Sequence, residues 1–181
     1  MTMEFVASGR MRRGRRFRVL LVIVVLYFVC CTIGGIYLAD ASLHPGRRAL
    51  TPDDVAMFQS MLRSVHADLR DVAITTSDQF VLRGWLLRPT RPNGDAVVVL
   101  HGLGDNRMGM TGYAQILLVH GYTVLLPDAR AQGVSGGSLA TFGLLEADDI
   151  HRWVDFLSAE VHPECVYGMG ESMGASQLLQ S

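Results

Sequence analysis

The chain has 181 residues and a formal net charge of −1, with 16 arginines, 17 acidic residues and no lysine. Schiff-base chemistry, pyridoxal phosphate attachment and the P-loop all need a lysine amine, so these classes are excluded. The length allows one ordinary domain plus an appendage.

Three cysteines are present, Cys30, Cys31 and Cys165, and their spacing matches neither a metal site nor a disulfide framework. We therefore expect no metal and no cofactor. Cys30 and Cys31 lie in an apolar run, where packed or lipid-facing side chains are favoured over acylated ones. Cys165 is expected to be a small buried hydrophobic residue.

Residues 1–18 form a basic leader with six arginines, and residues 19–39 carry no charge. About 20 apolar residues span a bilayer, so this run predicts a transmembrane helix. A cleaved signal peptide is the less favoured alternative, because its apolar region is only about 7–15 residues long. The arginines predict a cytoplasmic N-terminus and an extracytoplasmic body. Because the basic run adjoins the apolar one, we expect a membrane partner and no nucleic acid.

Residues 40–70 read as a connector with one helix. Thr51 is suited to the N-cap, Pro52 to the first helical position, and acidic residues follow in the first turn. Apolar residues then recur at helical spacing, which predicts a helix packed on the domain that follows.

Residues 71–181 read as one domain. Alternating residues at 72–76, a turn at 77–79 and an apolar segment at 80–87 predict a β-hairpin. Short apolar runs at 96–100, 122–126 and 165–169 predict buried strands, and helical patterns at 108–120, 145–157 and after Ser172 separate or follow them. This alternation predicts an α/β fold with a mostly parallel sheet. Glu146, Asp148 and Asp149 are expected on a solvated first turn.

The motif G-x-S-x-G occupies residues 170–174, between a predicted strand and a predicted helix. In this setting the motif forms a nucleophile elbow, a strained turn that exposes the serine hydroxyl. Ser172 is therefore the candidate nucleophile. Gly170 and Gly174 leave room for the turn, and the N-terminus of the following helix favours developing negative charge.

Two further motifs follow predicted strands, His101-Gly102-Leu103-Gly104 and the loop that begins Asp128-Ala129-Arg130-Ala131. With these motifs in this order, residues 71–181 resemble the α/β-hydrolase family. The resemblance is closest to serine aminopeptidases and dipeptidyl-aminopeptidase-like hydrolases, a group that includes membrane-anchored bacterial members.

The resemblance implies an oxyanion hole made by the backbone N–H groups of Leu103 and Met173. It also implies that His101, Gly102 and Asp128 shape loops and that His101 is not the catalytic base. Arg130 is expected to pair nearby. Ala131 stands where the family pattern has glycine, which affects the geometry of that loop.

A serine nucleophile needs a base and an orienting acid, and in this fold they follow the serine in the order Asp or Glu, then His. The nine residues after Ser172 contain neither. We therefore expect a fragment of a membrane-anchored serine hydrolase that cleaves ester or amide bonds in small-molecule or peptide substrates. The 181 residues alone are expected to show little turnover. The alternative is a degenerate, non-catalytic domain that acts in binding.

Overall fold

The computed structural model of the protein describes the backbone of residues 4–181 and the side chains of residues 14–181. The chain divides into two compact units, one that ends at Ser42 and one that comprises Leu43–Ser181. The first unit is a single helix, and the second contains the sheet.

Helix α1 (Glu4–Leu43) contains the predicted apolar segment 19–39. Its portion Gly14–Leu43 is long and apolar enough to cross a membrane, and its most apolar window has no buried residues. Length and composition alone establish this, and a signal sequence near the N-terminus meets the same criterion. The helix continues for four residues beyond the apolar segment, through part of the predicted connector.

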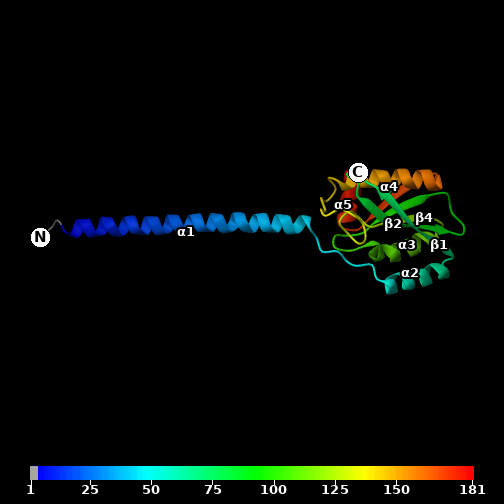
Figure 1. Ribbon diagram of the computed structural model, residues 1–181, viewed down its shortest axis with the longest axis horizontal. Coiled ribbons are helices and arrows are strands. Elements are labelled where there is room, and N and C mark those ends of the chain that lie inside the picture. Colours follow the sequence, from blue (N-terminus) through cyan, green and yellow to red (C-terminus); the bar gives the residue numbers. More distant parts are fainter. Residues whose placement is uncertain (1–3) are drawn as a thin grey trace. The chain divides into compact units, whose positions relative to one another are not determined.

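One mixed sheet forms the centre of the second unit (Figure 1). Its strands are β1 (Ala67–Thr75), β2 (Val81–Pro89), β3 (Ala96–Leu100), β4 (Thr123–Pro127) and β5 (Val166–Gly170). They lie in the order β1-β2-β4-β3-β5. Strand β2 is antiparallel to β1 and β4, whereas β3 is parallel to β4 and β5. The predicted hairpin followed by parallel strands is confirmed.

Helices cover both faces of this sheet. They are α2 (Pro52–Ser64), α3 (Thr111–Val119), α4 (Glu146–Val161) and α5 (Met173–Gln180), and a short 3-10 helix, η1 (Arg107–Met110), precedes α3. Helices α2 and α3 lie on one face, and α4 and α5 lie on the other (Figure 1). The α/β architecture predicted from the sequence is therefore confirmed.

Strand β3 is apolar throughout because both of its faces are buried in the core. All five of its residues are buried, and alternate side chains enter different cores. Val97 and Val99 belong to the cluster beneath α2 and α3, whereas Val98 and Leu100 belong to the cluster beneath α4. A strand covered on both faces has no solvent side to carry polar residues.

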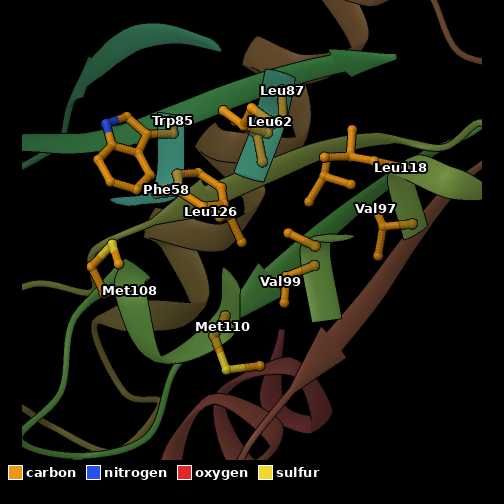
Figure 2. Packing of buried hydrophobic residues seen from close by; sticks show 12 residues of the cluster. Phe58, Leu62, Trp85, Leu87, Val97, Val99, Met108, Met110, Leu118 and Leu126 are labelled. Atoms are coloured by element: carbon orange, nitrogen blue, oxygen red, sulfur yellow. The ribbon is translucent and has the colours of Figure 1, made fainter. Parts of the chain in front are cut away.

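Helix α2 is attached to the domain as predicted. Thr51 forms a capping box with Asp54 at the start of the helix, an arrangement that satisfies two otherwise unpaired backbone donors. On the buried side, the ring of Phe58 stacks on Trp85 with centroids 5.0 Å apart. Figure 2 shows this pair beside Leu62 and Leu126. The helix thus closes one side of the core.

The structure differs from the sequence-based expectations in the start of strand β1 and in the exposure of Cys165, Glu146 and Asp149. Strand β1 begins at Ala67, five residues before the predicted start at residue 72, because its ladder extends to Pro89 at the end of β2. Cys165 is exposed, because it precedes β5 instead of lying inside it. Glu146 and Asp149 were expected to be solvated and are buried, whereas Asp148 is exposed.

Hydrogen bonds account for the buried carboxylates on α4. Glu146 accepts from the N–H groups of Thr141 and Gly143 and from the Thr141 hydroxyl. Asp149 accepts from two nitrogens of Arg130 at 2.7 and 2.8 Å. Burial raises the pKa of Asp149, and the bonds from Arg130 oppose that shift. The spacing of residues along a helix does not show which residues of other segments will donate hydrogen bonds to these carboxylates.

Asp78, in the turn between β1 and β2, makes stability depend on pH. The hydrogen bonds from Arg130 and then from Thr76 lower its pKa to about 2, below the unfolded value of about 3.9. The carboxylate therefore stabilises the fold above pH ~4, and this contribution is lost as the pH falls through about 2. We expect Asp78→Asn to lower Tm near pH 6, with the difference from wild type shrinking below pH ~4 and vanishing only below about pH 2.

Thermal unfolding followed by circular dichroism across this pH range checks the expectation. Asp155→Asn, on the exposed side of α4, is the matched control and should leave the pH dependence unchanged. A Tm difference for Asp78→Asn that stays constant from neutral to acidic pH would contradict the assignment.

Candidate active site

Ser172 lies between β5 and α5 with backbone angles φ 50° and ψ −111°. A non-glycine residue in a sparsely populated region costs about 1–3 kcal/mol and persists only where the surroundings impose it. Here the N–H of Glu171 donates to the Leu100 carbonyl at 3.0 Å, and the N–H of Gly174 donates to the Glu171 carbonyl at 2.9 Å. The Ser172 side chain is exposed at the apex of this turn. The geometry is that of a nucleophile elbow.

Close backbone contacts explain both glycines of the motif. A Cβ atom on Gly170 would lie 2.5 Å from the nitrogen of Ala175, and one on Gly174 would lie 2.5 Å from the carbonyl oxygen of Leu100. Neither backbone atom can move without shifting β3 or α5. Glycine at these positions therefore allows the elbow to pack against the end of the sheet.

His101 lies at the end of β3 and is 1% exposed. Its Nε2 accepts from the Ala129 N–H at 3.1 Å, so the ring proton is assigned to Nδ1. Nδ1 in turn donates to the Gly102 carbonyl at 2.8 Å. Because both ring nitrogens bind backbone groups, the ring joins the loop after β3 to the loop after β4. The loop-shaping role that the resemblance implies for His101 stays a prediction.

The loop after β3 packs against the elbow. A Cβ atom on Gly102 would lie 3.7 Å from Cβ of Ser172, which places the two backbones side by side. Within residues 4–181, the N–H groups of Leu103 and Met173 donate to no other atom. Met173 begins α5, where backbone N–H groups lack helical partners and carry partial positive charge. Two unpaired donors thus lie on the two loops that flank the serine.

Gln132 and Asp128 join the loop after β3 to the loop after β4. The side-chain oxygen of Gln132 accepts from the Gly104 N–H at 3.1 Å. Asp128 is fully buried and accepts from the N–H groups of Arg107 and Val134, at 2.8 and 2.9 Å. The loop-shaping role that the resemblance implies for Asp128 likewise stays a prediction.

Arg107 is a residue that the sequence analysis missed. Its Nη2 lies 2.9 Å from Oδ2 of Asp128 in an ion pair with side chains 2% and 0% exposed. Its guanidinium also lies 5.1 Å from the centroid of the Trp85 ring, at cation–π distance. A single arginine in a polar loop reads as a surface residue, and no spacing pattern indicates its burial.

Arg130 pairs as expected, with Asp149 and also with Asp78 across the β1–β2 turn. Ala131 has a positive φ of 58°, and its N–H donates to the Gly136 carbonyl at 2.9 Å. A left-handed conformation costs a non-glycine residue about 1–2 kcal/mol. Ala131 therefore adopts a left-handed conformation at the position where the family pattern has glycine.

The described part of the chain brings no base to Ser172, whose hydroxyl makes no hydrogen bond within residues 4–181. No group of three or more His, Cys, Asp or Glu side chains among the described residues is arranged to hold a metal ion. The residues in place are a nucleophile position, two candidate oxyanion donors and the contacts that fix their loops.

Solved structures share the fold that carries these residues. An esterase of Pyrococcus furiosus, Pf2001, is 31% identical with a TM-score of 0.61, and the match covers 75% of this chain and 51% of that chain. XC6422 of Xanthomonas campestris, described as an α/β serine hydrolase without a lid, is 22% identical with a TM-score of 0.55, over 62% of this chain and 54% of that chain. The chain has an α/β-hydrolase fold.

The chain spans about half the length of these solved structures. The uncharacterized protein YqkD of Bacillus subtilis is 32% identical over 96 residues, which cover 52% of this chain and 31% of that protein. No family model matches the chain.

Proposed function

We propose that this chain carries the nucleophile half of a membrane-anchored serine hydrolase, with Ser172 as the nucleophile. The observation that carries the proposal is the strained, exposed Ser172 beside the unpaired N–H groups of Leu103 and Met173. Donors fixed before charge develops stabilise an oxyanion without reorganisation in the transition state. His101, Gly102, Asp128, Gly170 and Gly174 position these groups.

In the proposed reaction, Oγ of Ser172 attacks the acyl carbonyl carbon and gives its proton to a base. The carbonyl oxygen becomes an oxyanion that accepts from Leu103 and Met173. The leaving group departs with a proton, and an acyl-enzyme remains on Ser172. Water then attacks this ester, releases the carboxylic acid and restores the serine hydroxyl. The base and its orienting acid are proposed to come from residues outside the 181, consistent with the greater length of the matched hydrolases.

Ester substrates are the first choice, because Pf2001, 31% identical to this chain, is an esterase. Aminoacyl amides are the second candidate substrate class, because the elbow resembles that of serine aminopeptidases. A panel of short acyl esters and aminoacyl anilides with the full-length gene product separates the two. Hydrolysis of the anilides without the esters would refute the ester assignment.

The proposed anchor is the segment 19–39 of α1, with the N-terminus cytoplasmic and the hydrolase domain extracytoplasmic. The charge asymmetry of the leader supports this orientation. Added protease should digest the domain in intact spheroplasts. Protection in intact spheroplasts, with digestion only after lysis, would reverse the orientation.

A fluorophosphonate probe tests the nucleophile, because it reacts covalently with activated serines. We expect labelling of the full-length gene product in membranes and its loss in Ser172→Ala. Ser176→Ala, one turn along α5, is the matched control and should keep the label. The 181-residue chain should label at least about 100-fold more slowly, because the base contributes roughly 10²–10⁴-fold. A full-length product that stays unlabelled would support a non-catalytic domain instead.

A further inference from the structure

Gln132 lies in the loop after β4, and its side chain contacts the loop after β3. The side chain is fully buried, and its Oε1 accepts from the Gly104 N–H at 3.1 Å. This contact fixes the orientation of the amide group, because Nε2 is a donor and cannot accept from an N–H. Gly104 directly follows Leu103, whose N–H is one of the two candidate oxyanion donors.

Leu103 and Gly104 are the central residues of a β-turn over residues 102–105. Gly104 has a φ of 74°, which is characteristic of the second central position of a type II turn. The hydrogen bond of the turn itself, from the Asp105 N–H to the Gly102 carbonyl, measures 3.4 Å. This is long compared with the usual value of about 2.9–3.0 Å. The bond to Gln132 is therefore the shorter of the two that restrain the Gly104 end of the turn.

Two side-chain contacts enclose the Leu103 N–H along the chain. Before it, Nε2 of His101 accepts from the Ala129 N–H at 3.1 Å. After it, Gly104 donates to Gln132. Both contacts join the loop after β3 to the loop after β4, so the short segment between them is restrained at each end.

The backbone around Gln132 is itself fixed to the sheet. The Gln132 N–H donates to the Ala129 carbonyl at 3.1 Å, and the Gln132 carbonyl accepts from the Ser135 N–H at 3.0 Å. The Ser135 hydroxyl donates to the Asp128 carbonyl at 2.8 Å and accepts from the Arg83 N–H at 2.9 Å. Because Arg83 belongs to β2, the acceptor offered to Gly104 has a defined position relative to the sheet.

Packing alone does not account for a glutamine at this position. Its Nε2 is buried and has no hydrogen-bond partner among the residues that the structure describes. A buried donor without an acceptor lowers stability. A methionine has a similar length and would avoid this penalty, but it has no oxygen to accept from the Gly104 N–H. The acceptor is the property that glutamine adds.

We propose that Gln132 is a positioning residue of the oxyanion hole. Its side-chain oxygen holds the turn at Gly104 and thereby keeps the Leu103 N–H directed at the oxyanion. This inference rests on the proposed function, in which Ser172 is the nucleophile. A donor that is fixed before charge develops stabilises the oxyanion without reorganisation. Gln132 acts through Leu103 and contacts no substrate itself.

The test compares Gln132→Met and Gln132→Glu in the full-length gene product. The first variant removes the acceptor oxygen, and the second keeps one at the same distance along the side chain. Gln59→Met is the matched control, because Gln59 is exposed on α2. The measurements are kcat and KM for p-nitrophenyl butyrate, the inhibition constant of a propyl trifluoromethyl ketone, and Tm.

The ketone probes the oxyanion hole without turnover. Oγ of Ser172 adds to its carbonyl carbon, the serine proton passes to the base, and the carbonyl oxygen becomes an oxyanion. No leaving group departs, so the affinity depends on how well the donors bind this oxygen.

We expect Gln132→Met to lower kcat at least ~10-fold and to weaken the ketone by a similar factor. The loss is smaller than the roughly 100–1,000-fold that follows removal of a donor, because the Leu103 N–H is displaced and not removed. KM should change less than about twofold, since the bound ester carries no oxyanion. Tm should stay near that of wild type, because methionine also removes the unpaired Nε2. Gln132→Glu should keep a higher kcat than Gln132→Met.

Wild-type kcat and ketone affinity in Gln132→Met would overturn the proposal. So would loss of the fold in that variant, or a kcat above that of Gln132→Glu. In those two cases residue 132 would act through packing, for which an apolar side chain is better suited than a buried carboxyl group. A wild-type product that neither hydrolyses the ester nor binds the ketone would refute the proposed function, and the positioning role with it.

Discussion

Replacing Asp128 by alanine is expected to lower the free energy of unfolding by about 3–5 kcal/mol, because it leaves the Arg107 guanidinium buried and without its partner. The substitution also removes acceptors from the N–H groups of Arg107 and Val134. Two loops of the candidate active site are held by this one carboxylate. Loss of stability should therefore be accompanied by loss of Ser172 labelling in the full-length product.

Denaturation of the chain in detergent micelles, followed by tryptophan fluorescence, measures this effect. Trp85 is a suitable reporter because it lies against Arg107. Glu160→Ala is the control, because Glu160 pairs with Arg70 and Arg88 at the surface and exposed pairs are worth about 0–1 kcal/mol. Equal losses in the two variants would show that burial of the Asp128 pair has no energetic consequence.

Gly174→Ala is expected to disrupt the elbow. The new methyl carbon would lie 2.5 Å from the Leu100 oxygen and 2.8 Å from the Leu100 carbonyl carbon, so the start of α5 must move away from β3. Overpacking typically costs about 1–3 kcal/mol. A displacement of about 1 Å at a nucleophile lowers reaction rates by roughly 100-fold. We expect both effects, seen as a lower midpoint of unfolding and slower fluorophosphonate labelling of the full-length product.

Gly112→Ala is the matched control for this substitution. A Cβ atom at Gly112, near the start of α3, meets no atom within 4 Å. Alanine in a helix is favoured over glycine by about 0.5–1 kcal/mol, so this variant should be as stable as wild type or slightly more stable. Wild-type labelling rates for Gly174→Ala would show that α5 adjusts without moving Ser172.

Local patterns in the sequence were sufficient for much of the fold. Strand β3 was predicted with its observed bounds, because a five-residue apolar run between two turns is typical of a strand that is buried on both faces. Thr51, Pro52 and Asp54 predicted the start of α2 because capping involves residues that are close in sequence. The elbow position was predicted because G-x-S-x-G specifies a local turn. The catalytic role of Ser172 stays a prediction.

Expectations failed where a residue's environment depends on distant partners. Asp149 looked solvated on a helix and is buried because Arg130, 19 residues earlier, pairs with it. No sequence pattern indicated that Arg107 is buried, since its burial depends on Asp128 and Trp85, which lie on other strands or loops. In each case the deciding contact joins segments that only the sheet brings together.

The sequence by itself determined the apolar helix, the α/β alternation and the position of the strained serine, because each depends on spacing within a few residues. Only the tertiary structure decided which groups surround Ser172. It placed Gly102 against the elbow, attached the connector at Leu43 and Arg47 to the loop after β4, and buried Asp128 with Arg107. These contacts join residues between 21 and 97 positions apart, and a local pattern carries no information on pairings over that distance.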